Sequence, residues 1–396
     1  MTFISWDRNV ILLTACQALF WSALMVGITM SGLVGQILAE DRSLATLPAG
    51  IMAFAAILVT RPASLLMQRM GRRTGFMLGA LSGLAGGLVS AEAIFAGDFV
   101  LFCLGSGILG GYQAVGQYYR LAATDSVAAE RRGRAVSTVM LGGIVAALAA
   151  PSLAIWSKDL FAPVFFAGSF LFVAALSIVA TGFIVFLNEE RPTTRQEAKA
   201  GRPMREILRQ PTLIVAIANA GIAQGVMVLV MLATPLAMVA CNYPVADAAL
   251  VIQWHVLGMF LPSFFSGRLI DRFGTSAIAL VGAVMLLASM AAAAAGIDFM
   301  NFGLALILLG TGWNFMYVAG TTMITAAHRP EERGRVQGAA ELSIAIIAAV
   351  ASFASGGLLH SLGWTAVNLA AAPLIILAAA LTIWFGRKQV RLAAQG

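Results

Sequence analysis

Apolar runs of 20 residues or more recur from one end of this 396-residue chain to the other. A helix of about 20 apolar residues crosses the ~30 Å hydrocarbon core of a bilayer and satisfies its own backbone hydrogen bonds there. The chain is 60% hydrophobic and 11% charged, which is roughly half the charged fraction of a soluble domain. These features predict an all-α, multi-pass membrane protein.

We expect twelve transmembrane helices, with boundaries good to a few residues. The expected spans are 9–37, 46–67, 75–96, 99–122, 135–157, 161–187, 211–240, 246–269, 276–297, 302–327, 336–361 and 364–386. With a cytoplasmic N-terminus, only Arg42 and Lys158 fall in outer loops, and the other 23 of the 25 basic residues fall inside. This asymmetry predicts that both termini are cytoplasmic. The net charge of +7 is then explained by loops beside the lipid bilayer, and no nucleic-acid partner is expected.

The two halves of the chain resemble each other. The segment Gln68-Arg69-Met70-Gly71-Arg72-Arg73 follows span 2, and Asp271-Arg272-Phe273-Gly274 follows span 8. A second pair, Glu130 to Arg134 and Glu331 to Arg335, follows spans 4 and 10. Both correspondences have an offset of about 200 residues, which indicates a duplicated six-span unit. We therefore expect an N-terminal six-helix bundle at 1–187, a cytoplasmic linker at 188–210 and a C-terminal six-helix bundle at 211–396.

Twelve spans in two halves, a central polar linker and a loop at Gly267 to Gly274 that fits the first eight positions of the motif G-x-x-x-D-R-x-G-R resemble the major facilitator superfamily. The resemblance implies two pseudo-symmetric bundles that give alternating access to a central site. It also implies a gating motif, for which the matching residues are Gly267, Asp271, Arg272 and Gly274, with Arg69, Gly71 and Arg72 in the first half. The first-half copy departs from the motif, because Ser64 and Gln68 replace its glycine and aspartate.

Enzymatic chemistry is not expected. The chain has no G-x-x-x-x-G-K-[ST] loop, only three lysines and no H-E-x-x-H sequence. These absences argue against ATP hydrolysis and against hydrolysis by a zinc-dependent enzyme site. Transport is therefore expected to be secondary, with no resident cofactor.

Four side chains form two pairs at helical spacing on consecutive spans: Met227 with Met231, and His255 with Met259. Residues four apart share one helix face. The short loop from Cys241 to Asp247 makes the spans antiparallel, which puts Met231 and His255 about 12 residues from the turn and the other two about 16. Three thioethers and an imidazole at matched depths would form a soft site that favours copper. The alternative is that both pairs only pack helices together.

The same four residues resemble the motif of CcoA-type copper importers, a branch of the superfamily that supplies copper for assembly of cbb-type cytochrome oxidase. The resemblance implies a transporter in a bacterial inner membrane. We expect a monomer, because the sequence has no dimerisation signal distinct from ordinary helix-packing ridges. Its substrate would be copper, expected as Cu(I), with a copper chaperone as a partner. Cys241 and Met238, near the outer mouth of the same hairpin, would be the first ligands that an incoming ion meets.

The same branch of the superfamily also contains riboflavin carriers, so the alternative is a carrier of a small organic solute such as riboflavin. Spans 1, 4, 7 and 10 line the central cavity in this superfamily, and here they carry amides and aromatic rings. These side chains would either contact a flat organic molecule or make hydrogen bonds between helices. They include Gln17, Trp21, Tyr112, Gln113, Asn219, Gln224, Trp313, Asn314 and Tyr317.

Overall fold

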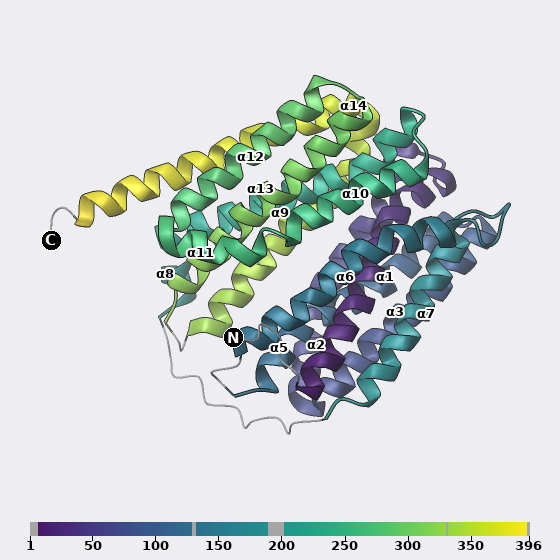
Figure 1. Ribbon diagram of the computed structural model, residues 1–396, viewed down its shortest axis with the longest axis horizontal. Helices are drawn as coiled ribbons and strands as arrows, with labels where there is room; N and C mark the ends of the chain where they lie inside the picture. The colour runs from purple at the N-terminus through teal and green to yellow at the C-terminus, as the bar shows by residue number, and fades with distance from the viewer. Residues whose placement is uncertain (1–6, 129–131, 189–201, 330–331, 394–396) are drawn as a thin grey trace. The chain divides into compact units, whose positions relative to one another are not determined.

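The computed structural model describes residues 7–128, 132–188, 202–329 and 332–393. Over these ranges the chain forms helices joined by turns, without β-strands (Figure 1). The described residues divide into two compact units. The first comprises the described parts of residues 1–194 together with Pro244–Gln253, and the second comprises those of residues 195–243 and 254–396. Most of the predicted linker, residues 189–201, lies outside the described residues, so the predicted domain boundaries stay a prediction.

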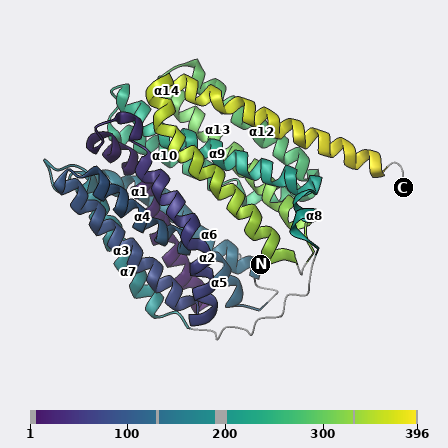
Figure 2. The same ribbon diagram turned by 180° about the vertical axis from the view of Figure 1, so that it is seen from behind.

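The first unit consists of long antiparallel helices. They are α1 (Arg8–Leu38), α2 (Leu47–Met70), α3 (Arg72–Ala96), α4 (Phe99–Gly116), α5 (Tyr119–Asp125), α6 (Arg132–Lys158) and α7 (Ala167–Val185), with a short 3-10 helix η1 (Arg42–Leu44). In this unit α3 packs against α4 and α7, and α1 packs against α6 and α7 (Figure 2). The approach of α3 to α7 requires Gly87, because a Cβ there would lie 2.8 Å from the backbone nitrogen of Ala174. Small residues therefore let these helices pack backbone to backbone.

The second unit is organised around α9, which packs against both α13 and α14. Its helices are α8 (Met204–Leu208), α9 (Pro211–Ala240), α11 (Ser263–Phe273), α12 (Thr275–Ala295), α13 (Phe299–Ala326) and α14 (Arg333–Ala393), together with the part of α10 (Val245–Phe260) from Trp254 onward. Two buried hydrogen bonds tie α9 to α14. The Asn219 amide donates to Thr382 Oγ1 at 2.8 Å, and Ser355 Oγ donates to the carbonyl of Leu229 at 2.8 Å. Asn219 is therefore an interhelical hydrogen-bond partner, which was one of its two predicted roles.

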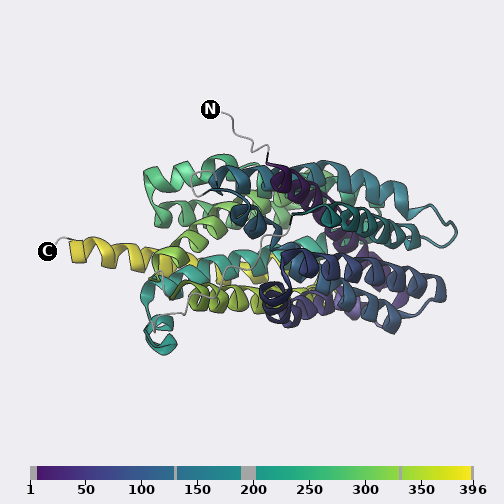
Figure 3. The ribbon, with the colours of Figure 1, turned by 90° about the horizontal axis from the view of Figure 1, so that it is seen from below.

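The all-α membrane fold is confirmed. Among the described residues, ten helices are long and apolar enough to cross a bilayer, and the bent pair α10 and α11 makes an eleventh span. The 61-residue α14 is broken at Gly363 (φ 77°), and its two segments, yellow-green and yellow in Figure 3, correspond to the predicted spans 336–361 and 364–386.

Two predicted spans differ in detail from the structure. The predicted span 161–187 begins only at Ala167, because residues 159–166 contain Pro163 and form turns that end at Phe166, whose φ is +71°. The predicted span 246–269 is bent by 40° between Phe260 and Ser263. Pro262 lies at this bend, where its missing N–H and its ring oppose a continuous helix.

The internal repeat is visible in the backbone at the two gating-motif glycines. Gly71, between α2 and α3, has φ 89° and ψ 158°, and Gly274, between α11 and α12, has φ 83° and ψ 158°. This region of φ and ψ is strongly unfavourable for residues with a Cβ atom. Corresponding positions of the two halves thus adopt the same glycine-dependent turn, which supports the duplication found in the sequence.

The turn leads to a prediction that separates the two glycines of the second motif. Gly274→Ala should destabilise the protein by about 1–3 kcal/mol, because alanine strains this backbone. Gly267→Ala should be neutral or slightly stabilising, because Gly267 lies within α11 and no atom lies within 4 Å of the position that a Cβ would take, and because alanine favours a helix. Thermal unfolding of the two purified variants measures the difference, and equal melting temperatures would contradict this interpretation.

Candidate functional site

His255 lies on α10 and is held by α13. Its ring is fully buried, and Nδ1 is 2.9 Å from the carbonyl oxygen of Leu306. Nδ1 must carry the proton to donate to that carbonyl, which leaves Nε2 as the acceptor nitrogen. Nε2 is buried, and none of the described residues gives it a hydrogen bond. The histidine therefore has a structural partner 51 residues away in sequence, which no local pattern reveals.

The end of α10 is fixed to α13 in the same way. The Asn314 amide donates to the backbone oxygen of Met259 at 2.7 Å and to Ser263 Oγ at 2.7 Å. At Gly310, a Cβ would overlap the carbonyl oxygen of His255 and lie 3.0 Å from the nitrogen of Met259. The backbones of α10 and α13 are therefore in direct contact over one turn. Asn314, a predicted cavity residue, serves as an interhelical hydrogen-bond partner.

The methionines of the predicted soft site also lie in packed surroundings. Met227 and Met259 are buried, whereas Met231 is partly exposed. The His255 ring and the backbone oxygen of Met259 make hydrogen bonds with α13, and α9 packs against α13 and α14. The choice of the four residues as a common ligand set stays a prediction.

The loop between α9 and α10 is shorter than expected. It covers residues 241–244 rather than Cys241 to Asp247, because α10 begins at Val245 and has Asp247 in its first turn. A carboxylate there favours the N-terminal end of a helix. Met238 is fully buried, while Cys241 is partly exposed and its N–H donates to the carbonyl of Ala237 at 3.0 Å. Met238 is thus not at the surface, where a first ligand was expected.

Two aromatic rings and an amide form a distinct cluster between α9 and α13. Trp313 and Tyr317 lie one helical turn apart and stack, with ring centroids 4.8 Å apart and planes within 16°. The indole N–H of Trp313 donates to Oε1 of Gln224 at 2.9 Å. All three side chains are partly exposed. We call these three residues the amide–aromatic cluster.

Two of the four predicted cavity residues of the first unit, Gln17 and Tyr112, are buried, whereas Trp21 and Gln113 are partly exposed. Phe20 lies edge-on to Trp21, Tyr112 and Tyr119, with centroid distances of 5.2–6.1 Å. Tyr112 and Gln17 are both 3% exposed. The rings of Phe20, Tyr112 and Tyr119 therefore form part of the core of the unit.

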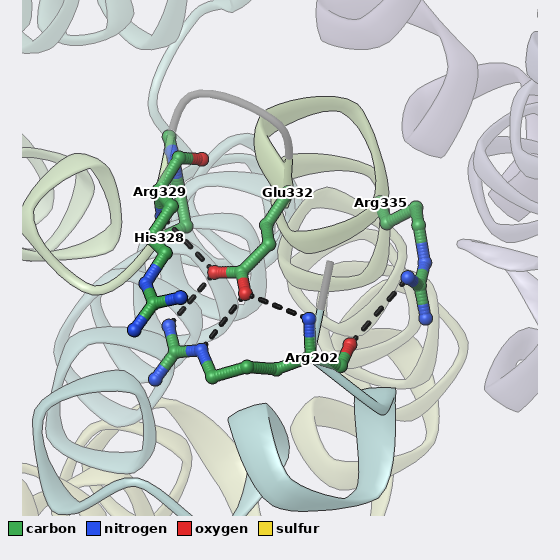
Figure 4. A network of polar contacts seen from close by, with 5 residues as sticks. All are labelled: Arg202, His328, Arg329, Glu332 and Arg335. Atoms are coloured by element: carbon green, nitrogen blue, oxygen red, sulfur yellow. Dashed lines mark hydrogen bonds and ion pairs between the residues drawn. The ribbon is translucent and has the colours of Figure 1, made fainter. Parts of the chain in front are cut away.

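Sequence reasoning missed an ion-pair network around Glu332, which lies between α13 and α14 (Figure 4). Glu332 is fully buried, and its Oε1 accepts hydrogen bonds from the backbone nitrogen and Nε of Arg202 at 3.0 and 2.8 Å. Its Oε2 accepts from Arg202 Nη2 at 2.7 Å and from the backbone nitrogen of Arg329 at 3.0 Å. Arg335 Nη1 lies 3.5 Å from the carbonyl of Arg202.

These contacts attach the residues before α8 to the loop that follows α13. Hydrogen bonds from the Arg202 side chain, and then from the backbone of Arg329, hold the pKa of Glu332 well below its ordinary value. The same hydrogen bond raises the pKa of Arg202, so both groups stay charged at neutral pH. The repeated segment Glu331 to Arg335 was the available signal, but its partner Arg202 lies about 130 residues away and could not be inferred from it.

Comparison with known proteins identifies the family. The model of the Major Facilitator Superfamily matches residues 10–312 and 223–395. The chain belongs to the major facilitator superfamily. The predicted family and fold are thus confirmed, and so is the prediction that the chain is not an enzyme.

Relatives within the major facilitator superfamily cover nearly the whole chain. The riboflavin transporter RfnT of Brucella anthropi is 44% identical over 374 residues, covering 93% of this chain and 94% of RfnT. The uncharacterized MFS-type transporter YdeG of Bacillus subtilis is 30% identical and covers 96% of this chain and 92% of its own length.

Solved structures of the superfamily have the same fold. A mutant of the nucleoside transporter NupG has a TM-score of 0.74 at 15% identity, covering 95% of this chain and 99% of NupG. The D-xylose-proton symporter has a TM-score of 0.75 at 14% identity, covering 95% and 96%. At these identities the likeness shows the fold alone.

The prediction of copper import is wrong. A 44% identical relative that covers nearly the entire chain is a riboflavin transporter, and the comparisons favour the organic-solute alternative. The i,i+4 spacing that suggested a copper site has a second physical origin, because residues four apart also form the packing face of a helix. His255 illustrates this, since its position on that face is fixed by Leu306 of α13.

Proposed function

We propose that this chain is a secondary transporter of riboflavin. The observation that carries the proposal is the 44% identity to the riboflavin transporter RfnT over 93% of this chain. Agreement of this extent spans both halves of the protein. The stacked rings and amide of the amide–aromatic cluster are chemically suited to a flat, polar heterocycle.

The proposed location is the cytoplasmic membrane of a bacterium, with both termini in the cytoplasm and uptake as the direction of transport. The uneven distribution of arginine and lysine between alternate loops supports this orientation. A fluorescent protein that matures only in the cytoplasm, fused to Gly396, should fluoresce in whole cells. A dark fusion protein present at full length in the membrane would contradict the orientation.

Growth of a riboflavin auxotroph tests the substrate. A bacterial strain that neither makes nor imports riboflavin should grow on micromolar external vitamin when it expresses this chain, and should not grow with an empty vector. The expected result is a lower riboflavin concentration for half-maximal growth, because a carrier replaces slow diffusion of a polar solute across the bilayer. Failure to grow, with the protein detected in the membrane, would contradict the proposal.

A further inference from the structure

The amide–aromatic cluster is held in one orientation by the residues behind it. Tyr317 packs against the buried apolar cluster that includes Ala216, Ala220 and Met323. Trp313 stacks on Tyr317 in turn, with the rings nearly parallel. The two rings therefore form a stack in which Tyr317 lies against the core of the second unit, while Trp313 keeps part of its surface exposed.

The amide of Gln224 is oriented by the same tryptophan. An indole has a donor and no acceptor, so the atom that faces Trp313 Nε1 at 2.9 Å must be the carbonyl oxygen of Gln224. The NH₂ group of the amide then points elsewhere, and none of the described residues accepts a hydrogen bond from it. Gln224 is partly exposed, so this donor pair is available to a ligand.

A neighbouring amide on α13 shows the contrast. Asn314 is 1% exposed, and its NH₂ group donates to both Met259 and Ser263. Asn314 is therefore fully used in holding helices together. Gln224 instead presents an oriented donor beside the stacked rings. An aromatic face with a hydrogen-bond donor at its edge suits a flat heteroaromatic ring that carries carbonyl oxygens.

We propose that Gln224, Trp313 and Tyr317 recognise the heteroaromatic ring of the substrate. The substrate ring stacks on the exposed face of Trp313, and the Gln224 amide donates a hydrogen bond to a carbonyl at the edge of that ring. The identity of that ring as a flavin rests on the proposed function. Tyr317 is a positioning residue, because it fixes the tilt of the indole. The proposal assigns recognition of the ring to the second unit and leaves the ribityl chain to other residues.

Binding to the purified full-length protein in lipid nanodiscs tests the proposal. The probes are riboflavin and lumichrome, which has the tricyclic ring without the ribityl chain, and their fluorescence reports binding. Trp313→Leu and Gln224→Glu should each weaken binding of both probes by about tenfold, because one removes the stacking face and the other replaces the donor by an acceptor. Trp313→Phe should recover part of the loss, because it retains an aromatic face.

The matched control is Trp254→Leu, which removes another tryptophan from the second unit. Trp254 is 50% exposed on α10, and the Trp254→Leu variant should bind both probes as the unchanged protein does. If Trp313→Leu does not fold, as judged by size-exclusion chromatography, Gln224→Glu carries the test.

Three outcomes separate this proposal from the proposed function. Normal binding of both probes to folded Gln224→Glu would overturn the recognition cluster and leave riboflavin transport intact. If Trp313→Leu or Gln224→Glu lost riboflavin binding but kept lumichrome binding, the recognition cluster would also be overturned, because its residues would then contact the ribityl chain and not the ring. If the unchanged protein bound neither probe, both the recognition cluster and the proposed riboflavin transport would be overturned.

Discussion

Replacing Gly310 by alanine is expected to disrupt the second unit. The added methyl group would overlap the carbonyl oxygen of His255 and lie 3.0 Å from the backbone nitrogen of Met259. These atoms are backbone of α10, so no side-chain rotation relieves the contact and the two helices must separate. Overpacking of this kind costs about 1–3 kcal/mol or more. Separation would also break the His255 to Leu306 hydrogen bond, so we expect a loss at the upper end of that range.

The matched control for Gly310→Ala is Gly303→Ala on the same helix. No atom lies within 4 Å of a Cβ at Gly303, and alanine favours a helix over glycine by about 1 kcal/mol. Thermal unfolding followed by intrinsic fluorescence, together with size-exclusion chromatography, should show a strong loss of folded protein for Gly310→Ala only. A Gly310→Ala protein as stable as the control would contradict the direct contact of α10 with α13.

Neutralising Glu332 is expected to lower the melting temperature by several degrees. Glu332→Gln keeps the size of the side chain, but it removes the charge that Arg202 binds through both Nε and Nη2 at 2.8 and 2.7 Å. Hydrogen bonds to a charged group are about twice as strong as neutral ones, and loss of one member leaves the other charge poorly compensated. Glu40→Gln, at an exposed carboxylate of the first unit, is the control and should melt as the unchanged protein does.

The effect of Glu332 should depend on pH in a defined direction. Because the network lowers the pKa of Glu332 from its ordinary value of 4.5, its stabilisation is fully present above that value and is lost as the pH falls toward the lower value of the folded state. The difference in melting temperature between the unchanged protein and Glu332→Gln should therefore be constant from about pH 5.5 to 7.5 and decrease below about pH 4.5. A difference that increases in acid would contradict the ion pair.

The fold was largely predictable because its main determinant is local. An apolar run long enough to cross a bilayer must satisfy its backbone within itself, so each predicted span has a counterpart among the helices. Gly71 and Gly274 were found through a repeated motif, and their shared positive φ explains why both positions carry glycine. The bend at Pro262 was not predicted, because a proline in an apolar run is compatible with either a kink or a continuous span.

The site was less predictable, because side-chain roles depend on partners far away in sequence. A histidine four residues from a methionine indicates a shared helix face, but not whether that face binds an ion or a neighbouring helix. The partner of His255 is Leu306, and the partner of Asn314 is Met259. Gln224 and Trp313, 89 positions apart, were each expected on cavity-lining spans through the family resemblance. Their hydrogen bond, which orients the amide, required the structure.

Uptake of labelled riboflavin by proteoliposomes that contain only this purified chain tests the central claim most directly. The proposed function predicts accumulation that saturates with substrate and exceeds that of protein-free liposomes, with competition by unlabelled riboflavin. Uptake equal to that of the protein-free liposomes, from protein shown to be folded and correctly inserted and under each imposed ion gradient, would contradict it.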